Sequence, residues 1–198
     1  GDMIKVPGSN GNLQDARSKG ADVRFVYSPL ECIKIVDENP TKKIIFFAIG
    51  FETTTPMTAP LINQVIEKRI DNILFHINHV TVPEPMRVLL DDETNRIDAF
   101  IGPAHVSVIS GSKIYEEFPR EYKKPVVVSG FEPVDVIKSV LMILKQLSEG
   151  RCEVEVEYSR SVTHDGNTEA QKLNEKFFEK REHFRWRGIG DIAKSALK

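Results

Sequence analysis

Polar side chains that could do chemistry follow four of the apolar runs in this sequence. Carboxylates and imidazoles are the groups with which proteins hold and transfer protons near neutral pH, and hydroxyl groups orient polar ligands. The residues are Glu52, Thr53 and Thr54 after the first run, His79 after the second, His105 and Ser107 after the third, and Glu132 and Asp135 after the fourth.

Each position also has a purely structural interpretation. Thr55 and Pro56 are typical of a capped helix start, where the dipole would stabilise Glu52. The two later carboxylates suit the same role ahead of their own helix, and His79 suits a turn in which it makes one hydrogen bond. His76 is not expected to share a metal with it, because a spacing of three along a strand directs the rings to opposite faces.

Several other activities lack a signal. No G-x-x-x-x-G-K-S/T loop is present, and Ser107 is not in a G-x-S-x-G elbow. The formal net charge is −2, which argues against a protein that mainly neutralises a phosphate backbone. The basic and aromatic run at 180–187 is therefore interpreted as a helix end with a docking strand, and no nucleic acid partner is expected.

Apolar runs rich in Val, Ile and Phe alternate with segments of helical spacing, which favours an α/β fold with mostly parallel sheets flanked by helices. FFAIGFE at 46–52 and VVVSGFE at 126–132 both end in Gly-Phe-Glu, which suggests two related units. The predicted strands are 23–27, 43–49, 72–77, 99–101, 126–128 and 154–156. The predicted helices are 30–39, 56–69, 83–91, 105–115, 133–149 and 168–181.

The helix predicted at 133–149 has the clearest amphipathic pattern. Its apolar residues share one face, which we expect to pack against the core, with Leu141 as a core residue. These residues are Ile137, Val140, Leu141, Leu144 and Leu147.

Composition places the chain among ordinary globular proteins. Of its 198 residues, 40% are hydrophobic and 28% charged, and no run approaches the roughly 20 apolar residues of a membrane helix. The two cysteines, Cys32 and Cys152, are expected to be unpaired thiols in a reducing compartment. We expect a cytoplasmic location and no membrane partner.

Seven segments, taken together and in this order, resemble the HypD-type maturation proteins of nickel–iron hydrogenases. They are GDMIKVPGS at 1–9, ADVRFVYSPL at 21–30, FFAIGFETTTP at 46–56, NHVTVPEPM at 78–86, GPAHVSVISG at 102–111, VVVSGFEPVDV at 126–136 and YSRSVTHDGNTEA at 158–170.

The resemblance implies two Rossmann-like lobes, of which the first is incomplete. Residues 1–55 would be the remainder of the first lobe, 56–150 the second, and 151–198 a strand and long helix that return towards the first. The family's cysteine motifs do not occur here. The chain is therefore either the central part of a longer protein or a relative that lacks those cysteines.

The resemblance also implies a function. HypD-like proteins act as a scaffold on which iron acquires its Fe(CN)2CO ligands, with a HypC-type chaperone and a HypE-type cyanide donor. Iron and a 4Fe-4S cluster are implied for the full-length protein, and none for this chain. The expected roles are proton handling by His105 with Glu132 and Glu52, and hydrogen bonding to cyanide or a partner by Thr53, Thr54, His79, Ser107 and Asp135.

Two other interpretations remain open. One is a small-molecule α/β enzyme that uses His105 with Glu52 and Glu132 without iron. The other is an interaction module without chemistry, in which the polar residues at the strand ends only cap helices.

Overall fold

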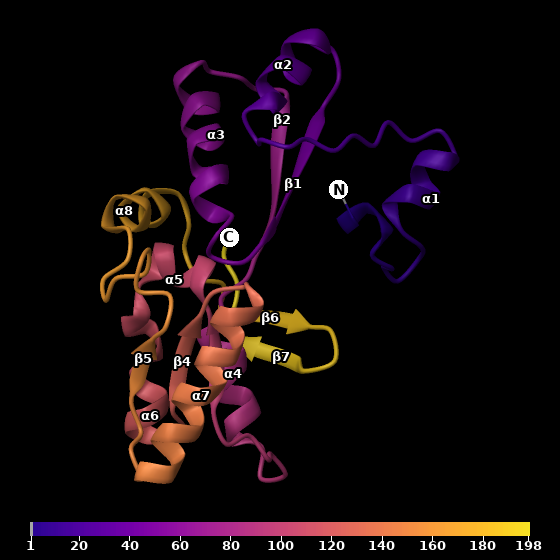
Figure 1. Ribbon diagram of the computed structural model, residues 1–198. Coiled ribbons are helices and arrows are strands. Elements are labelled where there is room, and N and C mark those ends of the chain that lie inside the picture. The colour runs from indigo at the N-terminus through magenta and orange to yellow at the C-terminus, as the bar shows by residue number, and fades with distance from the viewer. Residues whose placement is uncertain (1) are drawn as a thin grey trace. The chain divides into compact units, whose positions relative to one another are not determined.

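Strands and helices alternate along residues 2–198, the part of the chain that the computed structural model describes (Figure 1). The α/β class predicted from the sequence is therefore confirmed. The chain forms two compact units. One comprises the residues up to 46 together with 60–74, and the other comprises 47–59 and 75–198.

The first unit contains a short parallel pairing and several helices. The amide of Ile44 donates to the carbonyl of Asn72 at 2.8 Å, which begins the pairing of β1 with β2. The segment at 23–27, predicted as a strand, is irregular, and Tyr27 is 91% exposed. The elements that lie wholly or partly in this unit are η1 (Asp2–Lys5), α1 (Leu13–Ser18), α2 (Glu31–Glu38), β1 (Ile44–Gly50), α3 (Thr55–Glu67) and β2 (Ile73–His79).

The second unit is built on a three-stranded parallel sheet with the order β3-β4-β5. Val126, Val127 and Val128 of the central strand are completely buried, as expected for a parallel strand covered on both faces. Its elements are α4 (Pro83–Asp91), β3 (Phe100–Pro103), α5 (Ala104–Ser110), η2 (Ser112–Tyr115), α6 (Glu117–Glu121), β4 (Val126–Ser129), α7 (Pro133–Glu149), β5 (Val154–Val156), α8 (Thr168–Phe177), β6 (His183–Trp186) and β7 (Gly190–Ala193).

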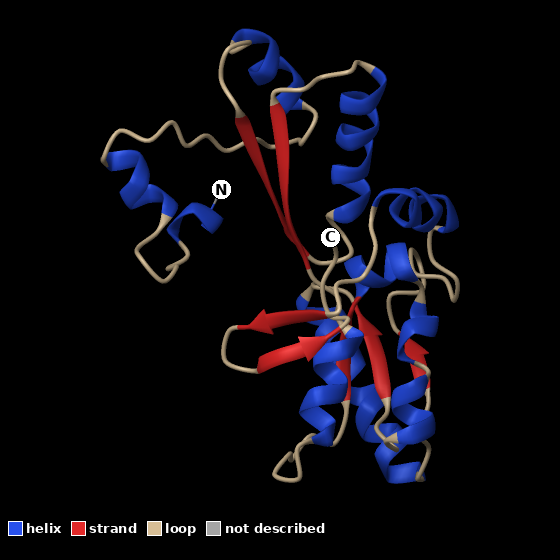
Figure 2. Cartoon of the chain, turned by 180° about the vertical axis from the view of Figure 1, so that it is seen from behind, coloured by secondary structure: helices blue, strands red, loops and turns tan. Residues whose placement is uncertain are grey.

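The two faces of this sheet are covered differently. Side chains of α4, η2 and α6, including Met86, Tyr115 and Phe118, pack with Val126 and Val128 in the hydrophobic core. The helix α7 packs against the other face of β4 (Figures 1 and 2). The chain thus places helices on both sides of β4, and polar side chains follow the carboxyl ends of the strands.

The helix predicted at 105–115 is interrupted at Gly111, which has φ of 80° and divides it into α5 and η2. The backbone of the 163–166 loop lies so close to Gly111 that a Cβ atom would collide with the carbonyl of His164. The amide of Ser112 donates to Thr163 O at 3.1 Å. This loop leads into α8, whose first turn is capped by Asn167.

The C-terminal residues differ from the prediction of a long helix at 168–181. Helix α8 ends at Phe177, and β6 and β7 form an antiparallel hairpin. The final residues then bridge two earlier segments, through Val80 with Ala196 and Lys180 with Leu197. Among the helices of residues 2–198, none is long and apolar enough to span a membrane.

The apolar face of α7 does not pack in the way the sequence analysis predicts. Leu141 is 60% exposed, so its prediction as a core residue is wrong. The buried residues of this helix are Asp135, Ser139 and Gln146. Ser139 Oγ donates to Asp135 O at 2.8 Å and Gln146 Oε1 accepts the amide of Glu153 at 2.9 Å, whereas Gln146 Nε2 is buried without a hydrogen-bond partner among residues 2–198.

Candidate functional site

The turn after β1 carries the first group of predicted site residues. Gly50 has φ of 129°, a conformation that favours glycine, and the Thr54 side chain occupies the space where a Cβ would lie. Thr54 Oγ1 donates to the carbonyl of Phe51 at 2.9 Å, which closes the turn. Thr53 is half-buried, and its side chain makes no hydrogen bond within residues 2–198.

Glu52 is the most unusual carboxyl group of this turn. One oxygen, Oε1, accepts the amide of Val82 at 2.9 Å, whereas Oε2 is buried and has no hydrogen-bond partner among residues 2–198. Burial raises the pKa of Glu52 to about 7, although the amide of Val82 opposes the shift. Glu52 can therefore hold or release a proton near neutral pH.

His79 lies inside the protein rather than on its surface. Its Nδ1 is 3.2 Å from Thr54 Oγ1 and its Nε2 is 3.0 Å from Thr58 Oγ1, and its ring packs edge-on against Phe178. Burial lowers the pKa of His79, which favours the neutral ring. Because Thr54 donates its own proton to a carbonyl, Nδ1 is assigned the imidazole proton and Thr58 donates to Nε2.

The helix after β2 brings a buried carboxylate, paired with an exposed lysine, to the same region. Glu84 Oε1 accepts from Lys180 Nζ at 2.6 Å and Oε2 accepts from Thr81 Oγ1 at 2.5 Å. Burial alone would raise the pKa of Glu84, but these two hydrogen bonds outweigh it and the pKa lies below its usual value. Near neutral pH Glu84 is therefore ionised, whereas Glu52 can hold its proton.

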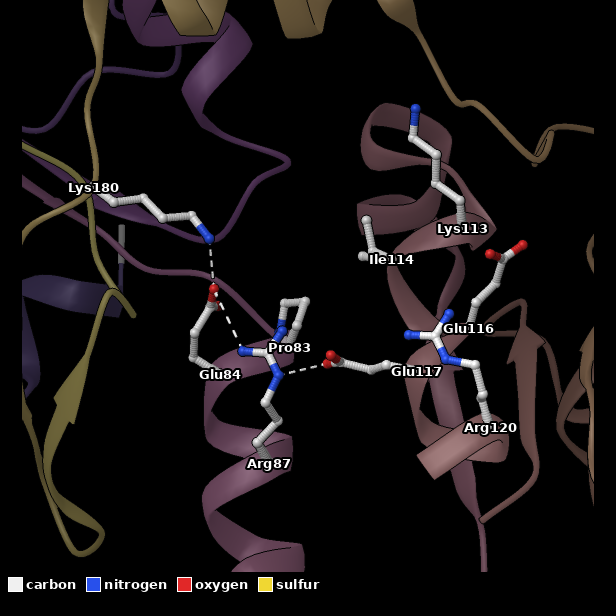
Figure 3. Close-up of a pocket in the computed structure, with 9 residues that line it drawn as sticks. All are labelled: Pro83, Glu84, Arg87, Lys113, Ile114, Glu116, Glu117, Arg120 and Lys180. Atoms are coloured by element: carbon white, nitrogen blue, oxygen red, sulfur yellow. Dashed lines mark hydrogen bonds and ion pairs between the residues drawn. The ribbon is translucent and has the colours of Figure 1, made fainter. Parts of the chain in front are cut away.

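A cleft of about 340 Å³ opens beside Glu84 (Figure 3). Charged groups alternate along it: Glu84 lies 3.8 Å from Arg87 NH1, and Arg87 Nε lies 2.6 Å from Glu117 Oε1. The other lining residues are Pro83, Lys113, Ile114, Glu116, Arg120 and Lys180. Opposite charges are thus largely neutralised in pairs across the cleft.

Ser107, on the helix that follows β3, links the end of that strand to the region around Glu52. It is completely buried, and its Oγ donates to Pro103 O at 2.9 Å and lies 3.4 Å from the hydroxyl of Tyr115. Burial raises the pKa of Tyr115 to about 12, and the nearby charge of Glu52 adds to the shift. The structure therefore brings Glu52 and Ser107 into one neighbourhood through Tyr115.

The fourth strand end forms a separate cluster around Asp135. This carboxylate is 3% exposed, accepts the amide of Glu132 at 3.4 Å in a capping box, and pairs with Arg160 NH2 at 3.2 Å. The Arg160 guanidinium stacks 3.8 Å from the centre of the Tyr158 ring. Glu132 itself is exposed and lies 3.7 Å from the same guanidinium.

His105 is exposed at the start of α5, directly after β3. Its ring lies 4.5 Å from that of Phe131, the residue before Glu132. Glu52, His105 and Glu132 each follow the carboxyl end of a strand, as predicted. His105 and Glu132 thus belong to neighbouring turns, and Glu52 lies in the buried region near Glu84 and Tyr115.

Sequence reasoning missed three important members of these clusters: Glu84, Lys180 and Arg160. The Thr81-x-x-Glu84 spacing before an apolar helix is a capping-box pattern and could have identified Glu84. Lys180 lies 96 positions away from its partner, and no local pattern indicates the contact.

The residues of this chain do not fit an iron–sulfur cluster. Such clusters are held by several thiolates, whereas Cys32 and Cys152 are free thiols in different units. Burial raises the pKa of Cys32 to about 11 and also raises the pKa of Cys152. Within the described part of the chain, no group of three or more His, Cys, Asp or Glu residues is arranged to hold a metal ion.

Comparison with known proteins gives a consistent result over the whole chain. The family model described as "HypD: Hydrogenase formation hypA family" matches residues 1–198. A hydrogenase maturation factor HypD from Rhizobium leguminosarum bv. viciae is 48% identical over 205 residues, covering 100% of this chain and 53% of that protein. Those from Rhodobacter capsulatus and Escherichia coli K12 are 46% and 40% identical, each over 100% of this chain and about half of their own length.

The chain thus spans about half the length of the curated relatives that it matches. The match to the family model extends over every residue, and the seven segments that resemble this family lie inside it. The chain belongs to the HypD family.

Proposed function

We propose that this chain acts in hydrogenase maturation, as the part of a scaffold on which iron, the substrate, acquires its Fe(CN)2CO ligands. Family membership over the whole chain and the shared name of its relatives, hydrogenase maturation factor, support the role. The observation that carries the site is the Glu52 carboxyl group, with one buried oxygen that has no partner among the described residues.

Proton handling is the first task that we assign to this site. Glu52 exchanges a proton near neutral pH because burial raises its pKa to about 7. His105 and Glu132 are exposed at adjacent strand ends, where they relay protons between the site and solvent. The charge of the ionised Glu84 favours the protonated form of Glu52 and the charge of its partner Lys180 opposes it, so burial is the main cause of the raised pKa.

Orientation of the cyanide nitrogens is the second task. A nitrogen of this kind accepts hydrogen bonds, and donors fixed in a water-poor site stabilise it best. Thr53 is assigned this role, because it lies on the turn beside Glu52, and Thr54, whose hydroxyl proton is donated to Phe51 O, holds the shape of that turn. We assign a positioning role to the buried residues, which already have partners: His79 holds Thr54, Ser107 contacts Tyr115, and Asp135 fixes the start of α7.

Partners and cofactors complete the proposal. A HypC-type chaperone and a HypE-type cyanide donor are the proteins with which the scaffold would work, in the cytoplasm. A 4Fe-4S cluster would belong to the full-length protein, and its thiolate ligands would come from residues outside this chain, since Cys32 and Cys152 do not fit one.

The test is complementation in cells whose own HypD gene is deleted, with the protein expressed from its complete gene. We expect Glu52→Gln, His105→Ala and Glu132→Gln each to reduce hydrogenase activity at least tenfold at unchanged protein level. The matched control is Glu175→Gln, a change of an exposed carboxylate on α8. Full activity in all three variants would refute the assignment of the site, and full activity without any HypD gene would refute the role in maturation.

A further inference from the structure

The outward face of α7 is apolar over most of its length. Val134, Ile137, Leu141 and Leu144 are 59%, 61%, 60% and 56% exposed. Soluble proteins rarely expose a contiguous stripe of large apolar side chains, and such stripes mark interaction sites.

The direction of this stripe follows from the helix geometry. Successive residues are rotated by about 100°, so Leu141 lies about 200° from Ser139, which is completely buried. Gln146 is completely buried as well and shares the Ser139 side, where the helix packs against β4. The stripe therefore points directly away from β4, and within the described chain nothing covers it.

The spacing of the stripe is that of a helix–helix seam. Val134, Ile137, Leu141 and Leu144 are separated by three, four and three residues, the pattern of the a and d positions of a heptad. A helix with the same seam packs on it knobs into holes. The kind of element that fits is therefore a second amphipathic helix.

The two flanks of the seam differ in character. On one side the seam is widened by Val140 and Leu147, which are 42% and 45% exposed. On the other side lie Lys138 and Lys145, whose side chains are 62% and 69% exposed and make only long ion pairs, at 3.9 Å with Glu157 and at 4.0 Å with Glu149. Flanking charges of this kind select the partner helix and its orientation.

The neighbouring strand adds another exposed apolar residue on the α7 side of the sheet. Ile101 of β3 is paired with Val127 of β4, so both side chains point to the face that α7 covers. Val127 is completely buried, whereas Ile101 is 47% exposed. Parallel sheets are normally covered on both faces, so Ile101 is a further apolar position on this side of the sheet that the described part of the chain leaves half-open.

A second copy of the chain fits this surface poorly. In an antiparallel pair of α7 helices the lysine flanks would face each other, and like charges at these positions repel. We propose instead that the α7 seam binds an amphipathic helix of a separate polypeptide, with apolar residues at its own a and d positions and acidic residues facing Lys138 and Lys145. A surface of this kind gives a maturation scaffold a specific docking site outside its polar strand ends.

The test uses two fluorescent 21-residue peptides that share a leucine heptad seam. One carries Glu along one flank of the seam, and the other carries Lys at the same positions. Fluorescence anisotropy measures the affinity of each for the 198-residue chain and for the protein expressed from its complete gene. We expect the Glu peptide to bind both proteins at least tenfold more tightly than the Lys peptide.

Variants identify the surface that binds. Leu141→Glu should weaken binding of the Glu peptide at least tenfold, and the double variant K138E/K145E should reverse the preference between the peptides. The matched control is Ile66→Glu, which changes an equally exposed apolar residue of α3 and should leave binding unchanged.

Any of four results would overturn the proposal. The first is equal affinity for the two peptides, and the second is equal weakening of binding by Ile66→Glu and Leu141→Glu. The third is binding to the 198-residue chain alone, which would mean that the seam is covered within the complete protein. The fourth is a dimer in analytical ultracentrifugation that Leu141→Glu dissociates, which would make a second copy the occupant.

Discussion

Replacement of Glu52 by Gln should change how the stability of the protein depends on pH. The folded protein holds the Glu52 proton more tightly than the unfolded chain, because burial raises the pKa from 4.5 to about 7. Raising the pH through this range therefore removes folding stability, since the folded state must carry a buried charge. The Gln variant keeps the shape of the side chain and cannot ionise.

The magnitude follows from the two pKa values. Each unit of pKa difference between folded and unfolded states is worth about 1.4 kcal/mol, so between about pH 5 and about pH 8 wild type should lose about 2.5 kcal/mol relative to Glu52→Gln. His79 acts in the opposite direction, because burial lowers its pKa and its contribution to stability increases as the pH rises. Subtracting the free energy of unfolding of wild type from that of Glu52→Gln at each pH removes the contribution of His79.

Urea unfolding at these two pH values, followed by circular dichroism, gives the free energies to be subtracted. We expect wild type and Glu52→Gln to have similar free energies of unfolding at the lower pH. At the higher pH we expect Glu52→Gln to be the more stable protein. Glu175→Gln, an exposed control, should show no such pH dependence. A constant difference between wild type and Glu52→Gln, or a Gln variant that is less stable at the higher pH, would contradict the environment described for Glu52.

Three further experiments test other parts of the structure. His105→Ala should alter thermal stability by no more than about 1 kcal/mol because the ring is exposed, whereas Phe118→Ala, completely buried in the core, should cost about 3–5 kcal/mol in the same scan. Asp135→Ala should cost about 1–3 kcal/mol in urea unfolding, because it removes the capping box of α7 and leaves Arg160 without its buried partner, and an unchanged midpoint would contradict this role. Cys32 should react with a thiol reagent in native protein far more slowly than after unfolding, since burial raises its pKa to about 11, and equal rates would contradict its burial.

Helix and strand positions could be predicted well where the pattern was strong. The helices at 83–91 and 133–149 occur with the predicted bounds, and five of the six predicted strands are present. The sixth, at 23–27, failed because alternation of apolar residues says nothing about whether a partner strand lies beside them. Tyr27 is almost fully exposed there.

The orientation of α7 shows a second limit of sequence patterns. Periodicity indicates that Ile137, Leu141 and Leu144 share a face, but it cannot tell a core-facing stripe from a docking surface. The core side of this helix consists of Ser139 and Gln146, which bond to the backbone nearby through their side-chain oxygens, while the buried Nε2 of Gln146 has no partner in the described part of the chain.

For the site residues, the position in the chain could be predicted but the burial could not. Their place after strand ends could be predicted, because glycine turns and helix caps are local signals. Burial could not be predicted, since it depends on segments far away in the sequence: His79 is covered by Phe178, and Glu84 is paired with Lys180. The raised pKa of Glu52 has the same long-range origin.

Infrared spectroscopy of the purified full-length protein tests the central claim most directly. Cyanide and carbon monoxide bound to iron give stretching bands in a region where proteins themselves absorb little. We expect protein purified with its maturation partners to show these bands, and Glu52→Gln and His105→Ala to lose them while the amount of folded protein matches that of Glu175→Gln. Bands of unchanged intensity in both variants would contradict the claim that these strand ends take part in assembling the iron group.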